Sequence, residues 1–468
     1  MTARHTRSAI ATVAIVAALS GSASAQSPRV YRVTDLGSLG GHYLVGLAIN
    51  NSGEIAGYGD LPDGTYHAFR WTQAGGLEDL GANGGWLSQA VGINDNGDVV
   101  GVYLDAFNDG HGFVAPRNGV MRDLRTPERP IVNANSITSD GRITGWMISV
   151  VPEFHGHAFR TSTDGTPQDL GSPLYDSVGW HINDAGDVTG YESRSPNGDV
   201  QSAFRFSDAA GKVYLGTLGG LRSSGMSINN AGVIVGWSEG PMGSSQWSRA
   251  FRARPDSPLE DLGTLGGDVA GAEAVNDAGT IVGWASGPLG FSAFLYTDAE
   301  GMVDLNLRAS APGGQPMSDA LAINNTGQIV VLYSGGTGTY LLTPVLDTRA
   351  PVITATVVSP RVLAPPNGRM VPVTVDVSVA DDFDPAPACS ITSVRNSEAP
   401  AWDRDRDVEV TGPLTVSLRA RRFGSGHGRT YTIGVRCSDA SGNAATSTAL
   451  VHVPHGHDDD DRRSTRER

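Results

Sequence analysis

The chain has 468 residues, of which 61 are Gly and 26 are Pro, and only 18% are charged. This excess of turn-forming residues predicts many short strands joined by tight turns rather than long helices. The formal net charge of −15 argues against a nucleic-acid partner, because neutralising phosphates requires a basic surface. A hydrophobic fraction of 39% is enough for packed cores and too high for a disordered chain.

The N-terminus carries the pattern of an export signal. Two arginines precede an apolar run from Ala9 to Leu19, and the small residues 23–25 come directly before Gln26. This order is typical of a secretory signal peptide, which we place at residues 1–25. The apolar run is too short to cross a bilayer. We therefore expect a secreted protein, extracellular or at the cell surface, without membrane insertion.

Three short strings recur in a fixed order through the first three quarters of the chain. The first is an Asp-Leu-Gly box, as in DLGSLGG at 35–41. The second is an Ile-Asn turn followed by an apolar run, as in INNSGEIAG at 49–57. The third is His-Ala-Phe, as at 67–69, which varies to Thr-Tyr-Leu at 339–341 in the last copy. The Asn position of the second string recurs with a period near 45, at positions 50, 94, 138, 183, 229, 276 and 324. Such self-similarity indicates a repeat architecture with seven units.

These strings resemble the HAF-repeat family of bacterial extracellular proteins, which is named for the His-Ala-Phe string. The resemblance covers roughly residues 31–344. It implies secretion and a β-rich repeat architecture. The family carries no agreed biochemical activity, so the resemblance does not fix a function.

Each unit reads as four short strands, which we name A to D in chain order. The Ile-Asn string is a tight turn between strands A and B. Strand C contains the Ala-Phe and strand D the Asp-Leu. The step from the third string to the next Asp-Leu-Gly box is 12 residues in six cases, which predicts a C–D hairpin of fixed register. Four strands in about 45 residues are typical of a propeller blade. A β-solenoid is the alternative, but its coils are usually shorter.

The two ends of the repeat region complement each other. The mature chain begins with a strand D that no A, B or C precedes, and the repeats end at Pro344 with a strand C that no D follows. The N-terminal strand can therefore complete the last blade and remove the free sheet edges. We predict an all-β chain with a seven-bladed β-propeller over residues 26–344.

A second module follows at residues 345–454. Val373, Val375, Val377 and Val379 alternate with polar residues, as in a half-buried strand. The segment 430–453 is similar to the closing strands of bacterial immunoglobulin-like domains, which implies a β-sandwich. Export would place Cys389 and Cys437 in an oxidising compartment, so we predict that they form a disulfide. The charged tail at 455–468 should be disordered.

No short motif for catalysis is present: the sequence lacks HExxH, GxSxG and a phosphate-binding loop. An enzyme is therefore not indicated, and no cofactor or metal is predicted. The turn strings at 94–98 and 183–187 alternate carboxylates, but they lack the later acidic ligand of a calcium loop and read as hairpin turns. His67, His111 and His157 share one repeat position, where we expect hydrogen bonds at a strand edge rather than metal binding.

Acidic residues in the second module are candidates for a calcium site. Asp381, Asp382 and Asp384 precede a second group at 403, 405 and 407. Modules similar to this one bind calcium at strand ends. Solvated loops are the favoured interpretation, because oxygen clusters are common without an ion.

Aromatic residues supply the candidate binding site. Five of them lie on strand B or in the variable B–C loops: Trp146, Tyr191, Trp237, Trp247 and Trp284. Packing between blades is the alternative role, because large rings often fill that space. Variation in these loops, against fixed A–B and C–D turns, is typical of a recognition surface. We expect extracellular binding or adhesion to a glycan or other surface polymer.

The alternative function is a carbohydrate-active enzyme of propeller type, either a glycosidase or a lyase. The carboxylates of such enzymes are marked by no short motif. A carboxylate pair facing the central channel would favour the enzyme. A face of exposed aromatic rings without such a pair would favour the binding protein.

Overall fold

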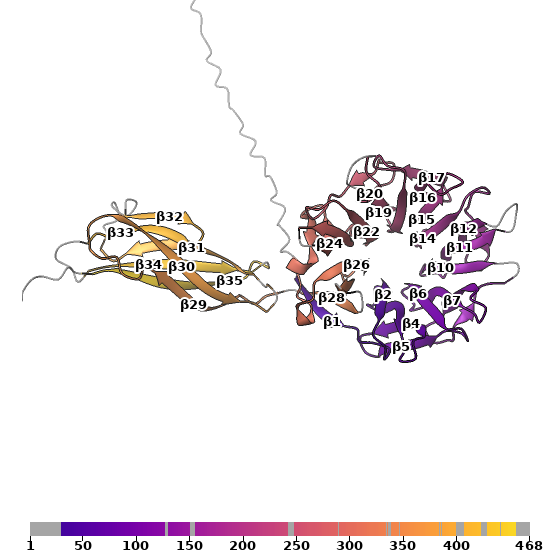
Figure 1. Ribbon diagram of the computed structural model, residues 1–468, viewed down its shortest axis with the longest axis horizontal. Coiled ribbons are helices and arrows are strands. Elements are labelled where there is room, and N and C mark those ends of the chain that lie inside the picture. Colours follow the sequence, from indigo (N-terminus) through magenta and orange to yellow (C-terminus); the bar gives the residue numbers. More distant parts are fainter. Residues whose placement is uncertain are drawn as a thin grey trace, which may run out of the picture.

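The computed structural model describes residues 30–454, apart from 127–129, 150–154, 242–247, 289, 334, 336–337, 346, 383, 385, 399–406, 423–427 and 440. The described chain is built of β-strands, with two short 3-10 turns, η1 (Leu305–Leu307) and η2 (Pro312–Gly314). Its strands form a ring of sheets and a separate pair of sheets (Figure 1). No helix among the described residues is long and apolar enough to span a membrane. The predicted signal peptide and charged tail lie outside the described residues.

The ring contains five four-stranded sheets and one eight-stranded sheet. Neighbouring strands pair antiparallel, and the eight-stranded sheet is joined across its middle by a single parallel pair, Tyr66 with Leu87. The strands nearest the central axis in Figure 1 are the first strands, which correspond to the predicted strand A. They are β2 (Leu44–Ile49), β6 (Leu87–Ile93), β10 (Ile131–Ile137), β14 (Ser177–Ile182), β18 (Ser223–Ile228), β22 (Ala270–Val275) and β26 (Met317–Ile323).

The other strands of the ring follow in the predicted order. Strand B is represented by β3 (Ile55–Asp60), β7 (Val99–Leu104), β11 (Ile143–Ser149), β15 (Val188–Ser193), β19 (Ile234–Ser238), β23 (Ile281–Gly287) and β27 (Ile329–Tyr333). Strand C is represented by β4 (Tyr66–Thr72), β8 (Gly110–Ala115), β12 (His155–Thr161), β16 (Gln201–Ser207), β20 (Arg249–Ala253), β24 (Gly290–Thr297) and β28 (Thr339–Val345). Strand D is represented by β5 (Gly76–Gly81), β9 (Arg122–Asp123), β13 (Pro167–Asp169), β17 (Gly211–Gly216), β21 (Glu260–Asp261), β25 (Gly301–Asp304) and β1 (Val30–Asp35).

The N-terminal strand closes the sheet that holds the last repeat. Strand β1 pairs antiparallel with β28, from Val30 opposite Val345 to Asp35 opposite Tyr340. The sheet order is β1-β28-β27-β26, as the unmatched strands at the two ends of the repeat region predict. Closure covers the edge of β28, whose backbone groups would otherwise be free to pair with another chain.

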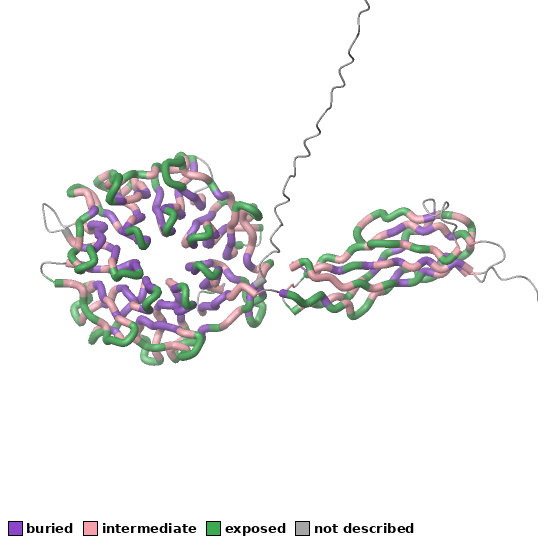
Figure 2. Tube along the Cα trace, turned by 180° about the vertical axis from the view of Figure 1, so that it is seen from behind, coloured by how far each residue is buried: buried purple, intermediate pink, exposed green. Residues whose placement is uncertain are grey.

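The third string supplies the buried anchor of each sheet. Its Phe side chain is fully buried in six units, at Phe69, Phe113, Phe159, Phe204, Phe251 and Phe294. Each Phe packs with residues of its own unit and of a neighbouring one; Phe294, for example, shares a cluster with Ala272 of its own sheet and Ala250 of the preceding sheet. In Figure 2 the buried segments run along the strands of the ring, while the connections are mostly exposed. The hydrophobic core is therefore shared between adjacent sheets.

The fixed step of 12 residues has a direct structural cause. Nδ1 of His67 lies 2.8 Å from Asp79 Oδ1, and Nδ1 of His111 lies 2.8 Å from Asp123 Oδ2. His157 makes the same contact with Asp169, at 2.9 Å. The strand-edge hydrogen-bonding role predicted for the three histidines is thus confirmed. These contacts join strand C to strand D and hold their register.

A glycine in strand B permits close approach to strand A. A Cβ atom at Gly57 would lie 1.9 Å from the backbone oxygen of Val45, so any larger residue would clash. A register shift in the opposite strand accompanies this contact. The last unit differs, because Val331 replaces the glycine and pairs with Tyr340. In the last unit Tyr340 therefore occupies the position that Phe69 has in the first unit. The third string of the last unit begins one residue earlier than the predicted Thr-Tyr-Leu at 339–341.

The second part of the chain consists of two antiparallel sheets. One has the order β29 (Val352–Ser359), β30 (Met370–Ala380), β33 (Thr415–Arg419), β32 (Val408–Gly412), and the other has the order β31 (Ala388–Asn396), β34 (Arg429–Ser438), β35 (Ala444–Val453). Both sheets contribute to one core, in which Val373 and Val375 of the first pack with Tyr431 and Ile433 of the second. The alternation predicted for β30 is confirmed, since its buried or half-buried valines alternate with exposed polar residues.

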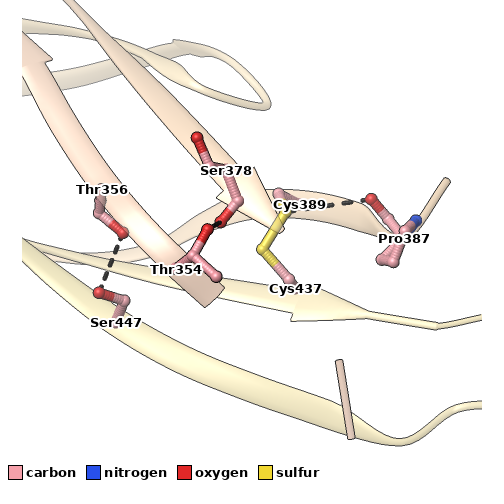
Figure 3. The surroundings of a disulfide bond; sticks show 7 residues. All are labelled: Thr354, Thr356, Ser378, Pro387, Cys389, Cys437 and Ser447. Atoms are coloured by element: carbon pink, nitrogen blue, oxygen red, sulfur yellow. Dashed lines mark hydrogen bonds between the residues drawn. A yellow bond between two sulfur atoms is a disulfide. The ribbon is translucent and has the colours of Figure 1, made fainter. Parts of the chain in front are cut away.

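The predicted disulfide between Cys389 and Cys437 is present. It joins opposite residues of β31 and β34. Figure 3 shows this bond together with hydrogen bonds of the same region, one of them from Thr356 Oγ1 to Ser447 Oγ (3.0 Å) between the sheets. The cysteines are 48 positions apart, and the chain-entropy model gives about 4 kcal/mol of stabilisation for a loop of that length.

The asparagine of the Ile-Asn turn links neighbouring units of the ring. In the turn of Asn229, the side-chain Oδ1 accepts hydrogen bonds from the backbone N–H groups of Ala231 and Val233. The Nδ2 group donates to the backbone oxygen of Asn276 in the next unit, at 3.0 Å. The same bridge starts from Asn50, Asn94, Asn183, Asn276 and Asn324, and the last of these returns to Asn50.

The third unit lacks this bridge. Thr138 stands at its asparagine position, and the Thr138 hydroxyl donates to Asp140 within its own turn. A different amide joins the third and fourth units, from Asn135 Nδ2 to the backbone oxygen of Gly179 at 2.9 Å. We refer to the six asparagine bridges together as the asparagine ring.

We expect Asn229→Ala to lower the melting temperature of the ring. The substitution removes the bridge to the Asn276 carbonyl, which keeps Gly279 N as its donor. It also removes the acceptor for Ala231 N and Val233 N, at a cost of about 1–3 kcal/mol for the three contacts. Thr138→Asn should restore a seventh bridge and stabilise by up to about 1 kcal/mol. Asn118→Ala, exposed in the turn between β8 and β9, is the control and should stay within about 0.5 kcal/mol. Calorimetry measures all three; an Asn229→Ala chain that melts like Asn118→Ala would contradict the bridging role.

Candidate functional site

A central cavity of about 450 Å³ lies on the axis of the ring. Every sheet contributes its first strand and the following Ile-Asn turn to the wall. A volume of this size suits a small ligand or one end of a polymer. The cavity therefore lies on the side of the ring formed by the fixed turns, where the sequence predicts only scaffold.

The mouth of this cavity is a polar ring built from the residue after each bridging position. Its members are exposed: Asn51, Asp95, Ser139, Asp184, Asn230, Asp277 and Asn325. They bind one another around the circle. For example, Asn230 N donates to Asp277 Oδ1 at 2.9 Å, and Asp277 N donates to Asn325 Oδ1 at 2.9 Å. These seven residues include three carboxylates and no basic side chain. The mouth therefore favours neutral or cationic ligands over anions.

Deeper in the cavity the wall is mostly apolar. This wall is lined by the residues that lie three positions before each turn asparagine or, in the third unit, before Thr138: Leu47, Val91, Asn135, Trp180, Met226, Glu273 and Leu321. Glu273 is the one carboxylate in this layer, so it places a titratable group inside a largely apolar chamber. One signal in the sequence could have identified Glu273. It is a charged residue at a position of strand A where the other repeats carry an apolar residue or an amide.

Glu273 forms an acidic pair with Asp319 from the adjacent inner strand β26. The Trp284 indole Nε1 donates to Glu273 Oε1 at 3.0 Å, and Asp319 Oδ1 is buried without a hydrogen-bond partner. Burial, followed by repulsion from Glu273, raises the pKa of Asp319 from 3.8 to about 8. Burial also raises the pKa of Glu273. At neutral pH the pair therefore holds a proton.

The structure describes four of the five predicted aromatic candidates. Trp146, Tyr191, Trp237 and Trp284 lie on the strand B positions of their sheets and are half-buried; Trp247 lies outside the described residues. Tyr191 contacts Trp180, with ring centroids 6.4 Å apart, and Trp284 contacts Phe291 edge-on at 5.7 Å. Trp284 also reaches Glu273, so this candidate is connected to the central cavity through its indole N–H.

Exposed aromatic rings lie on the opposite side from the turns. We call the B–C and D–A connections the loop rim, and the A–B and C–D connections the turn rim. Phe107 is 86% exposed, Phe291 57% and Trp86 45%, and all three lie on the loop rim. The Trp86 indole Nε1 donates to Asn108 Oδ1 at 2.8 Å. Trp86 directly precedes β6 and the Phe107 loop directly follows β7, and the pairing of Leu87 with Leu104 brings the two together.

The candidates predicted from the sequence do not include Trp86, because it lies in a D–A segment. The prediction followed aromatic residues on strand B and in the B–C loops. Tyr66 N of the preceding unit also donates to the backbone oxygen of Trp86, at 3.1 Å, so adjacent units meet at this residue.

The turns considered as calcium loops are hairpin turns, as predicted. Asp187 accepts hydrogen bonds from the Arg205 guanidinium, and Asp98 Oδ1 accepts one from the backbone N–H of Arg117. These carboxylates therefore serve contacts between strands of the ring.

Comparisons with known proteins place the chain among distant structural neighbours. No protein-family model matches it, and no curated protein does. Solved structures similar to it include the β-propeller domain of the Trilobed protease from Pyrococcus furiosus (8% identity, 65% of this chain, 98% of that chain, TM-score 0.42). Others are the gluconolactonase XC5397 from Xanthomonas campestris (12%, 69% and 93%, 0.32) and the acylaminoacyl peptidase from Pyrococcus horikoshii (10%, 84% and 57%, 0.43). At these scores their activities carry no argument for this chain.

The acidic pair predicts a pH dependence of stability. With its pKa raised to about 8 in the folded state, Asp319 binds a proton that the unfolded chain releases above about pH 4. Stability should therefore fall as pH rises from 5 to 8, by at most about 1.4 kcal/mol per pH unit for one proton. Asp319→Asn should flatten this slope, whereas Asp109→Asn, in an exposed loop, should keep it. Equal slopes in the two variants, measured by calorimetry at three pH values, would contradict the pairing.

Proposed function

We propose that this chain is a secreted protein of the HAF-repeat type that binds a glycan or another surface polymer through its loop rim. In this proposal the ring is a seven-bladed β-propeller, with the eight-stranded sheet counting as two blades, and the second part is an immunoglobulin-like sandwich. The strand order A to D in every unit and the pairing of β1 with β28 support the blade count. The export pattern of residues 1–25 supports secretion.

The neighbouring exposed rings of Trp86 and Phe107 carry the binding proposal. An exposed aromatic residue has lost little of its apolar surface to the core, so it remains available to stack on a sugar ring. The hydrogen bond from Trp86 to Asn108 fixes the indole before a ligand arrives, which lowers the entropy lost on binding. The predicted candidates Trp146, Tyr191, Trp237 and Trp284 are half-buried, and in this proposal they support the rim from beneath. Trp247 remains a candidate in the loop between β19 and β20.

A glycan array probed with the mature chain tests this proposal. Phe107→Ala and Trp86→Ala should each weaken binding to the best array ligand about tenfold, equivalent to about 1.4 kcal/mol, with little change in melting temperature. Val120→Ala is the matched control, because Val120 is 80% exposed but lies on the turn rim. Equal affinity of the Phe107 and Val120 variants would place the binding surface elsewhere.

The acidic pair, of which Glu273 lines the cavity, favours a second candidate function, a carbohydrate-active enzyme. Glycosidases use two carboxyl groups, one of which is protonated at neutral pH. The pair formed by Glu273, which lines the cavity, and Asp319, which is buried beside it outside the cavity lining, holds a proton at neutral pH and so meets this requirement. The mostly apolar wall and the acidic mouth favour an uncharged sugar over an anionic one.

Hydrolysis or elimination on a panel of polysaccharides tests the second candidate. Glu273→Gln and Asp319→Asn should each lower any activity at least a hundredfold, in the range of a lost general acid or base, while leaving binding at the loop rim unchanged. Phe107→Ala should lower binding and leave hydrolysis of short substrates intact. Activity that persists in Glu273→Gln would exclude this pair as the catalytic group.

A further inference from the structure

Three aspartates from separate segments meet at one end of the two-sheet part of the chain. Asp347 precedes β29, Asp381 directly follows β30, and Asp439 directly follows β34. One carboxylate oxygen from each lies within 4.8 Å of the other two. We call these residues the three-aspartate cluster.

The cluster holds a buried oxygen that lacks a partner. Asp347 is 6% exposed, and its Oδ2 atom is buried without a hydrogen bond, while Oδ1 accepts one from Arg349 N at 2.9 Å. Asp439 is also buried, at 7% exposure. A buried carboxylate oxygen without a donor is costly unless positive charge compensates it.

Basic side chains of this part of the chain are engaged elsewhere. The Arg349 guanidinium pairs with Asp382. Among the described residues, no ion pair links Asp347 or Asp439 to a basic side chain. Asp407, which is equally buried, shows the other solution: it accepts hydrogen bonds from Arg429, at the opposite end of β34. Asp347 therefore contributes a buried carboxylate oxygen that no basic side chain among the described residues compensates.

We propose that Asp347, Asp381 and Asp439 bind one calcium ion. Calcium prefers hard oxygen ligands at 2.3–2.6 Å, so two oxygens on one ion lie at most about 5 Å apart, as the cluster oxygens do. Three carboxylates from three segments suit its flexible coordination better than the strict octahedron of magnesium. Water molecules complete the coordination.

Hydrogen bonds around the cluster hold its carboxylates in place. The Asn443 amide Nδ2 donates to Asp439 Oδ2 and to the backbone oxygen of Asp347, both at 3.0 Å. Asp384 N donates to Asp381 Oδ1 at 2.9 Å. Such contacts orient ligands before the ion binds and preserve their spacing.

The proposed site differs from the acidic groups that the sequence brings to notice. Of those residues only Asp381 belongs to it. Asp382 pairs with Arg349, and Asp407 lies with Arg429 at the other end of the sandwich. Positions 403 and 405 lie outside the described residues. Asp347 belongs to the segment that joins β28 to β29, so a bound ion ties this connecting segment to the ends of β30 and β34.

Calorimetry of the full mature chain tests the site. The protein is stripped with EDTA and melted alone, with CaCl2 and with MgCl2; the sandwich transition is the one that falls when the disulfide is reduced. Calcium at about a hundred times its Kd should raise that transition by about 5 °C or more. Asp347→Asn should abolish the rise, and the control Asp382→Asn should keep it. In EDTA, Asp347→Asn should melt at or above the parent, because one of three like charges is gone.

Titration calorimetry of the unaltered chain with CaCl2 gives an independent result that requires no variant to fold. One more ion per parent chain than per Asp347→Asn or Asp381→Asn chain supports the site. No calcium-dependent shift in the parent, or equal shifts in the Asp347 and Asp382 variants, overturns it. An equal shift with MgCl2 overturns the assignment to calcium.

Discussion

The ring depends on an amide that serves two turns at once. Each bridging asparagine closes its own turn with Oδ1 and donates from Nδ2 to the backbone of the next turn, as Asn324 does to Asn50 across the point where the repeats meet. The side chains are buried, so both contacts replace water and each is worth about 1 kcal/mol. In the six units that carry the asparagine, one residue therefore specifies both the turn and the junction to the next unit.

This constraint separates the two rims of the ring. The turn rim must repeat closely, because the asparagine ring joins the units there. The exposed residues that follow the bridging positions place three carboxylates around the mouth of the central cavity. The loop rim carries no such requirement, so loop length and aromatic content vary. Phe107 and Trp86 are exposed there at little cost to the core. The fold thus offers a polar, enclosed site on one side and an open, apolar surface on the other.

Charge compensation distinguishes the acidic sites of the molecule. Asp407 is buried against Arg429, so its charge stabilises the fold and is unavailable to a ligand. Asp319 is buried beside Glu273, and its pKa rises until it holds a proton. Asp347 has a buried oxygen without a hydrogen bond and no arginine partner among the described residues, and in our proposal a cation compensates it. The same residue type therefore supports an ion pair, a proton-holding pair and a proposed metal site, according to what packs against it.

The sequence by itself determined the strand order, the turn positions, the C–D register and the disulfide. Each of these follows from spacing within one unit or, for the disulfide, from the presence of only two cysteines. The step of 12 residues predicted that strands C and D keep one register, which the His67–Asp79 contact now explains. Tertiary structure alone decided that Glu273 meets Asp319 and that Asp347 meets Asp439. These partners belong to different units or segments. The periodicity of a sequence determines only which face of a strand a residue occupies. Packing between units or segments determines which residue lies opposite it.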